Sequence, residues 1–391
     1  MKSYDVIVVG GGLIGSSIAS ELAAQKLRVV LLDRQQPGRE ASSAAAGMLS
    51  PAPDSPEALP LVPLAQQSLG LYPDFVSAIE KTSGKSVAFA RTGALEVLDH
   101  ADAVTKCDHR LAQYATLGIA AEPISIESAR AQEPALNPNA AATIWLSGEA
   151  TVDPWLLIEA TLEAAKNRGV EIVASRAVTS VLGEAGRCAG VIAGGEKITA
   201  ANVIVAAGSF CGSLDEITAD RAIPIARYAP THPVRGQMLA MRSSKLNLKK
   251  VLRSEHGYIV PRADGRIIAG STLENVGFAK DTTPAGLRKI FEAAVALAPG
   301  LADAEIVETW AGLRPGTPDQ LPIIGPSDRP GLLVATGHYR NGILLAPITA
   351  QLIREWIVQG KTSFDSGRFS PLRFSAKNSG LTMGKSIPAT F

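Results

Sequence analysis

The chain is poor in cysteine and has no long hydrophobic run. Its 391 residues include only three cysteines, Cys107, Cys188 and Cys211, which are widely spaced and form no CxxC pair. This pattern argues against a disulfide framework or a metal site and is typical of a reducing compartment. No apolar segment reaches the roughly 18 to 20 residues that span a bilayer, and Asp5 interrupts the first apolar run, unlike in a secretory signal. We therefore expect a soluble, cytoplasmic protein without a metal.

The chain also lacks an excess of charge of either sign. It has 38 basic and 37 acidic side chains, a formal net charge of +1, and no run of five or more basic residues. A nucleic-acid-binding face is therefore not expected. The length is too great for one ordinary core and predicts two domains.

One glycine motif stands near the N-terminus, in Gly10-x-Gly12-x-x-Gly15. An apolar, β-branched run precedes it and a helical pattern follows, while the next predicted strand ends in Asp33. Such glycines allow a tight turn and the approach of a pyrophosphate, and the acid accepts hydrogen bonds from a ribose. The motif predicts a dinucleotide site, with a glycine-rich structural turn as the alternative. Leu13, Ile14 and Arg34 flank the motif and the acid and are assigned to the same site.

No second GxGxxG occurs in the chain. One bound dinucleotide is therefore expected, and its electrons must pass to something other than a bound nicotinamide. FAD with dioxygen or an electron carrier as acceptor fits this arrangement better than a pyridine-nucleotide reductase does.

The remaining pattern predicts an α/β protein with a discontinuous, Rossmann-like FAD-binding domain and a mostly antiparallel β substrate domain with flanking helices. We expect the first domain to comprise residues 1–85, 148–224 and 311–368, and the second to comprise residues 86–147 and 225–310. Residues 369–391 form a predicted C-terminal tail. The Pro/Ser-rich segment 50–63 is interpreted as a linker or lid, and Pro73 is expected to break a helix over residues 64–82.

The segment WAGLRPGTPDQLPIIG (residues 310–325) places Arg314 among apolar residues, glycines and prolines. A buried guanidinium stays charged and needs either a structural acid or an anionic ligand. Asp319 is the nearest acid in this segment, so both interpretations remain open from these residues.

Four segments together resemble one family: residues 41–49, 256–262, 310–325 and 337–349. The chain is similar, over residues 3–365, to glycine oxidases of the flavin-dependent D-amino-acid oxidase superfamily, the type associated with thiamine biosynthesis. The resemblance implies noncovalent FAD, since no cysteine lies near the GTPDQLP turn. It implies oxidation of glycine, and also of sarcosine, D-alanine or D-proline, by hydride transfer from Cα to flavin N5. The products would be an imine, then a 2-oxo acid, ammonia and hydrogen peroxide from dioxygen. A homo-oligomer and a hand-over to a thiazole synthase are further expectations.

The resemblance also implies roles for individual residues. Arg314 and Tyr258 would bind the substrate carboxylate, and Met48, His256 and Arg340 join them as candidate catalytic residues. The alternatives without a catalytic role are a tyrosine on a strand face for Tyr258, a solvated turn residue for His256 and a residue of the cavity wall for Met48. Contacts to FAD are expected from Ser42, Ser43, Ala46, Gly47, Met48, Val178, Ala207, Gly208, His338, Arg340, Asn341, Gly342, Ile343 and Leu344.

Two rival functions remain open. One is a carrier-linked D-amino-acid or proline dehydrogenase that passes electrons to a quinone. The other is a flavin-bound subunit without catalysis.

Overall fold

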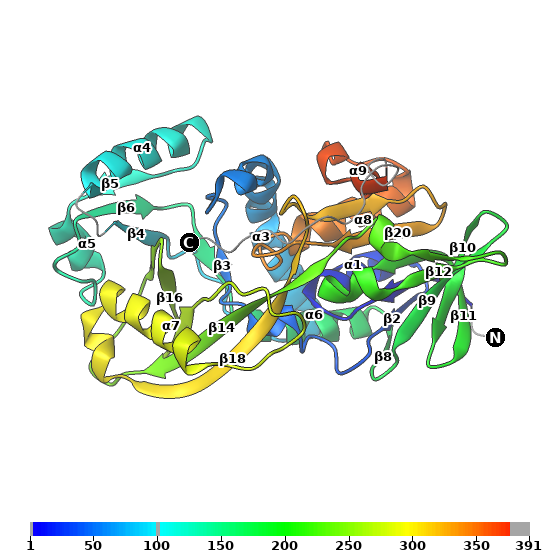
Figure 1. Ribbon diagram of the computed structural model, residues 1–391, viewed down its shortest axis with the longest axis horizontal. Helices are drawn as coiled ribbons and strands as arrows, with labels where there is room; N and C mark the ends of the chain where they lie inside the picture. Colours follow the sequence, from blue (N-terminus) through cyan, green and yellow to red (C-terminus); the bar gives the residue numbers. More distant parts are fainter. Residues whose placement is uncertain (1–2, 99–101, 376–391) are drawn as a thin grey trace.

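The computed structural model describes residues 3–98 and 102–375 and consists of two bodies, each built on a β-sheet (Figure 1). The N-terminal strand and the last long helix lie in the same body, while two of the segments between them, residues 94–146 and 232–316, supply the sheet of the second body. Within the described residues, no helix combines the length and the apolar character needed to span a membrane. The same residues contain no cluster of three or more His, Cys, Asp or Glu side chains that could hold a metal ion.

The first body contains a ten-stranded sheet. β1, β2, β8, β11 and β20 form its parallel part, with β1 between β2 and β11. β-branched residues dominate β1 and β2, as expected for strands that are covered on both faces. The strands are β1 (Ser3–Val9), β2 (Val29–Leu32), β8 (Glu171–Val173), β9 (Val178–Glu184), β10 (Arg187–Ala193), β11 (Glu196–Val205), β12 (Asp215–Ile217), β13 (Ala222–Pro224), β19 (Ile323–Pro326) and β20 (Leu332–Thr336).

Four helices pack together against this sheet: α1 (Leu13–Ala24), α3 (Val62–Ser83), α6 (Pro154–Asn167) and α8 (Ala346–Gln359). Asp153 caps the start of α6, because its carboxylate accepts hydrogen bonds from the amides of Trp155 and Leu156. The expected break at Pro73 is wrong, since α3 continues through it. The buried face of α3, including Tyr72 and Val76, holds the helix in place despite the one missing hydrogen bond.

The second body contains an eight-stranded, mostly antiparallel sheet in the order β18-β14-β17-β16-β15-β4-β6-β5. α7 packs on one face of this sheet, and α4 packs beside β4 and β6. The elements are β4 (Ala94–Leu98), α4 (Ala103–Thr116), β5 (Glu122–Ile124), α5 (Ile126–Gln132), β6 (Ala142–Leu146), β14 (His232–Arg242), β15 (Val251–Ser254), β16 (Gly257–Pro261), β17 (Arg266–Gly270), α7 (Pro284–Leu297) and β18 (Glu305–Gly316).

Short elements connect the two bodies. The predicted linker at residues 50–63 folds in part, because η1 and the first turn of α3 lie within it. β18 crosses the predicted boundary at residue 311 and reaches from the second body toward the first (Figure 1). The remaining elements are α2 (Ala41–Ala44), β3 (Met48–Leu49), η1 (Pro56–Leu61), β7 (Ala150–Thr151), η2 (Gly208–Ser213), η3 (Ile225–Arg227), η4 (Pro299–Asp303), η5 (Gly367–Phe369) and α9 (Leu372–Ser375).

The predicted tail begins as part of the first body. Phe369 is buried in its core, and Arg373 forms an ion pair with Asp319 at 2.8 Å. The rest of the predicted tail, residues 376–391, lies outside the described residues.

Candidate functional site

A cavity of about 790 Å³ lies between the two bodies and takes lining residues from both. Gly10, Asp33 and Ser42 line it from the first body, and Tyr258 and Arg314 line it from the second. A cavity of this volume lies within the usual range for ligand and cofactor sites, about 300 to 1,000 Å³. It therefore brings both halves of the predicted site into one space.

The glycine motif forms one end of this cavity. Gly10 has φ +105°, and a Cβ on it would lie 2.5 Å from the carbonyl oxygen of Ala206. A Cβ on Gly15 would lie 2.0 Å from the carbonyl oxygen of Gly10. These two glycines therefore allow the tight turn between β1 and α1. Gly12, in the same turn, lines the cavity.

Asp33 lies beside this turn. Its carboxylate accepts hydrogen bonds from the amide of Gly11 at 2.7 Å and from the amide of Gln35 at 2.9 Å. Burial raises the pKa of Asp33, while the two amides act in the opposite direction. The described residues form no salt bridge with it, so the cavity contains a carboxylate that is held by backbone groups alone.

Most of the expected FAD contacts line the cavity, and four do not. The lining includes Gly10, Gly12, Ile14, Asp33, Arg34, Ser42, Ala46, Gly47, Met48, Val178, Ala207, Gly208, His338, Arg340, Asn341, Gly342 and Ile343. Leu13, Gly15, Ser43 and Leu344 are absent from it. Leu13 still takes part indirectly, since its amide donates to the hydroxyl oxygen of Ser42 at 3.0 Å.

The segment before α8 is held by hydroxyl groups of α3. The Tyr72 hydroxyl donates to the carbonyl of Ile343, and the Ser68 hydroxyl donates to the carbonyl of Leu344, both at 2.6 Å. These contacts fix the peptide planes next to the cavity. Burial lowers the pKa of His338 to about 3, so its ring is neutral, and it pairs with the Thr349 hydroxyl at 2.9 Å.

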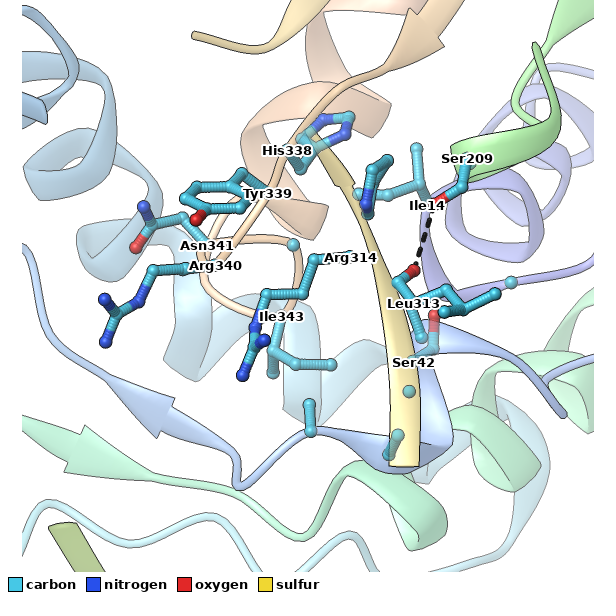
Figure 2. A pocket seen from close by; sticks show the side chains of 18 of the residues that line it. Ile14, Ser42, Ser209, Leu313, Arg314, His338, Tyr339, Arg340, Asn341 and Ile343 are labelled. Carbon is cyan, nitrogen blue, oxygen red and sulfur yellow. Dashed lines mark hydrogen bonds between the residues drawn. The ribbon is translucent and has the colours of Figure 1, made fainter. Parts of the chain in front are cut away.

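Arg314 extends from β18 into the cavity, beside Ile343 (Figure 2). Its guanidinium donates to the Ser271 hydroxyl at 2.7 Å and to the Thr272 carbonyl at 3.2 Å. Among the described residues no carboxylate forms a salt bridge with it, and burial lowers its pKa. Asp319 does not pair with Arg314, because it forms an ion pair with Arg373. Within the described residues, neither Asp319 nor another acid is a structural partner of Arg314.

Gly236 and Tyr258 shape the surroundings of Arg314. A Cβ on Gly236 would lie 2.1 Å from Nη1 of Arg314, so only glycine at this position of β14 leaves room for the guanidinium. The Tyr258 hydroxyl interacts with Arg314 and partly offsets the effect of burial on its pKa. Sequence reasoning missed Gly236, because no local pattern marks a glycine that faces an arginine from another strand.

The other catalytic candidates are placed differently. His256 lies at the turn between β15 and β16, its side chain is 56% exposed near Glu255, and it does not line the cavity. The structure therefore corresponds to the solvated-turn alternative for His256. Arg340 pairs at 2.8 Å with Asp54, which belongs to the predicted lid segment. Met48 lines the cavity, in line with the cavity-wall alternative.

A second arginine on the cavity wall was not predicted. Arg253 donates to Glu96 at 2.7 Å, to Glu149 at 2.8 Å and to the Ser50 hydroxyl at 2.8 Å. The Tyr114 hydroxyl also donates to Glu96 at 2.7 Å. Burial raises the pKa of Glu149, and Arg253 counteracts that shift. Arg110 adds a second cation at 3.3 Å from Glu96, so the two carboxylates of this cluster are balanced by two arginines and need no ligand.

These residues fit an FAD molecule. The glycine turn at the start of α1 offers a positive helix end without an acidic side chain in its first turn, which suits a pyrophosphate. Asp33, at the end of β2, suits a ribose. The amides of Gly342 and Ile343 find no acceptor within the described residues and lie on the wall of the cavity. They could donate to the ring edge of a flavin.

Comparisons with known proteins agree with this fit. The family model described as "DAO: FAD dependent oxidoreductase" matches residues 5–356. A glycine oxidase of Pseudomonas putida is 33% identical over 94% of this chain and 98% of its own length. The crystal structure of glycine oxidase from Geobacillus kaustophilus superposes with a TM-score of 0.87 at 29% identity, covering 95% of this chain and 98% of that one.

A longer relative matches as well. The bifunctional protein ThiO/ThiG of Trichormus variabilis is 35% identical over 97% of this chain. The match covers 56% of that relative, so this chain spans about half of its length.

Proposed function

Because the chain belongs to the family of FAD-dependent oxidoreductases that the DAO model describes, we propose that it is an amino acid oxidase whose preferred substrate is glycine. Sarcosine, D-alanine and D-proline are the other substrates proposed for the same site. Glycine would give an imine, which hydrolyses to glyoxylate and ammonia, while dioxygen is reduced to hydrogen peroxide.

The observation that carries this proposal is the uncompensated charge of Arg314. Its partners are a hydroxyl and a carbonyl, and no acid of the described residues pairs with it. A planar guanidinium holds a carboxylate with two charge-assisted hydrogen bonds. A small substrate carboxylate is therefore the anion that this position suits.

The remaining residues orient the substrate. Arg314 and Tyr258 bind the carboxylate, which directs Cα toward the amides of Gly342 and Ile343 across the cavity. FAD held by these residues would supply the hydride acceptor and the transfer of two electrons to dioxygen. Glycine has almost no apolar surface, so the carboxylate supplies most of the binding and orientation.

Two observations test the proposal together. Anaerobic addition of glycine should bleach the absorbance of the bound flavin, and addition of glycine under air should produce hydrogen peroxide in step with oxygen uptake. Bleaching without peroxide, and with electrons passed readily to a quinone, would favour the carrier-linked dehydrogenase. No bleaching by any of the four amino acids would favour a flavin-bound subunit without catalysis.

The relative named ThiO/ThiG joins two proteins in one chain. We propose on this basis that the imine is handed to a thiazole synthase. Mixing the enzyme with such a synthase should lower the yield of free glyoxylate per oxygen consumed, and an unchanged yield would contradict the hand-over.

A further inference from the structure

The loop between β17 and α7, residues 271–283, belongs to the second body but reaches the first. Figure 1 shows it extending along β14 and β18 toward the middle of the molecule. Its start carries Ser271 and Thr272, the two partners of Arg314. The loop therefore begins at the substrate end of the cavity.

Both ends of this loop are tied to β14. Glu274 exchanges two backbone hydrogen bonds with Arg235 and also forms an ion pair with its side chain. Gln237 accepts a hydrogen bond from the amide of Thr283 at 2.7 Å and donates to Glu274 at 2.8 Å. The stretch between these anchors, residues 275–282, is therefore a short arm with a fixed base.

The tip of this arm contacts residues of the nucleotide end. The ring of Phe278 stacks on Phe210 with centroids 4.7 Å apart, and the Arg34 guanidinium lies over the Phe210 ring at 3.5 Å. Lys280 pairs with Glu40 at 3.0 Å, and Glu40 pairs with Arg34 at 2.6 Å. Phe210, Arg34 and Glu40 line the cavity, whereas Phe278 and Lys280 stand behind them.

We propose that Phe278 and Lys280 are positioning residues that hold the side chains at the adenosine end of the FAD site in place and thereby slow the release of FAD. Stacking holds the Phe210 ring, and the Lys280–Glu40–Arg34 chain of charges holds Arg34 against it. The segment that carries Phe278 and Lys280 is anchored in the second body. FAD therefore cannot leave past Phe210, Arg34 and Glu40 while Phe278 and Lys280 hold these residues. The proposal concerns the cofactor and does not depend on which amine is oxidised.

The test measures FAD dissociation as the rise in flavin fluorescence after dilution of the holoenzyme. F278A should raise the dissociation rate about 3- to 10-fold, the effect of losing one aromatic pair. K280Q should raise it about 2- to 5-fold, as expected for a partly exposed ion pair, and K280R should retain the wild-type rate. V276A is the matched control, because Val276 is an exposed apolar residue of the same arm, and its rate should stay within twofold.

Two further readouts distinguish this positioning role of Phe278 and Lys280 from a general loss of stability. The melting temperature of the apoprotein should be the same for F278A, K280Q and V276A. Salt should accelerate FAD release from the wild type more than from K280Q, because screening weakens the same ion pair. Dissociation rates of F278A and K280Q that match V276A, or an equal fall in the melting temperature of the apo and holo forms, would overturn the proposal.

Discussion

Arg253 and Arg314 line the same cavity, and their surroundings differ. Arg253 contacts two carboxylates, a tyrosine hydroxyl and a serine hydroxyl. Arg314 contacts one hydroxyl and one carbonyl, with no salt bridge among the described residues. Both stand in an environment that penalises charge, so the comparison shows which cation is structural and which is available to a ligand.

Two carboxylates, Glu149 beside Arg253 and Asp33 on the cavity wall, repeat this contrast with opposite sign. Glu149 is fully paired with Arg253 and the Ser50 hydroxyl. Asp33 has only backbone amides as hydrogen-bond donors. The cavity thus contains a carboxylate without a salt bridge at the nucleotide end and a guanidinium without a salt bridge at the substrate end, among the described residues.

Removing Arg253 should have the largest effect on stability. Arg253→Ala leaves the buried Glu149 without a cation and Glu96 with Arg110 alone, and the loss of one partner of a buried ion pair typically costs about 3 to 5 kcal/mol. We expect the melting temperature to fall by roughly 6 °C or more on that basis. Arg314→Ala serves as the comparison and should leave the melting temperature nearly unchanged. An equal fall in melting temperature for both variants would contradict the conclusion that Arg253 is structural and Arg314 is available to a ligand.

Gly236→Ala should act on activity and leave the fold intact. The new Cβ would meet the mobile end of Arg314 at 2.1 Å, so the guanidinium must shift and the substrate loses its orientation. A misplacement of about 1 Å can cost roughly 100-fold, and we expect kcat/KM for glycine to fall by about that factor. Gly148→Ala is the control, since no atom lies within 4 Å of its added Cβ. Wild-type kinetics for Gly236→Ala would contradict the role assigned to the Arg314 guanidinium in binding the substrate carboxylate.

Asp33→Ala should weaken FAD binding and leave the carboxylate clamp unaffected. The loss of hydrogen bonds to a charged acceptor is worth about 1 to 3 kcal/mol. Titration of the apoprotein with FAD, followed by flavin fluorescence, should show a correspondingly higher Kd, with an unchanged KM for glycine at saturating FAD. An unchanged Kd would place the ribose contact elsewhere.

The nucleotide end was predictable because its signals are local. Gly10, Gly12, Gly15 and Asp33 lie on one strand-turn-helix-strand unit, and the structure places them around one turn. The antiparallel strands β16 and β17 of the second body were also predictable, since each is short and bounded by turn residues. Local backbone preference alone predicted the break at Pro73, and tertiary packing overrode it.

The charge compensation could not be predicted, because it is assembled from distant segments. Arg253 reaches Glu96 and Glu149 across 157 and 104 positions of the chain. Asp319 is five positions from Arg314, yet it pairs with Arg373 in α9. Whether an arginine is free for a ligand depends on these pairings, and only a three-dimensional arrangement reveals them.

The most direct test of this account is anaerobic flavin reduction in the wild type, Arg314→Ala and Arg314→Lys, with glycine and with methylamine. Loss of one partner of a buried, hydrogen-bonded charge pair typically costs about 2 to 5 kcal/mol, or roughly 30-fold to several-thousand-fold. The account predicts that Arg314→Ala lowers the apparent affinity for glycine by at least 30-fold, within that range. Arg314→Lys should fall between the two, all three proteins should retain FAD, and slow reduction by methylamine, which has no carboxylate, should change little. An Arg314→Ala enzyme that sheds FAD, or that reacts with glycine as the wild type does, would contradict the claim that Arg314 holds the substrate carboxylate.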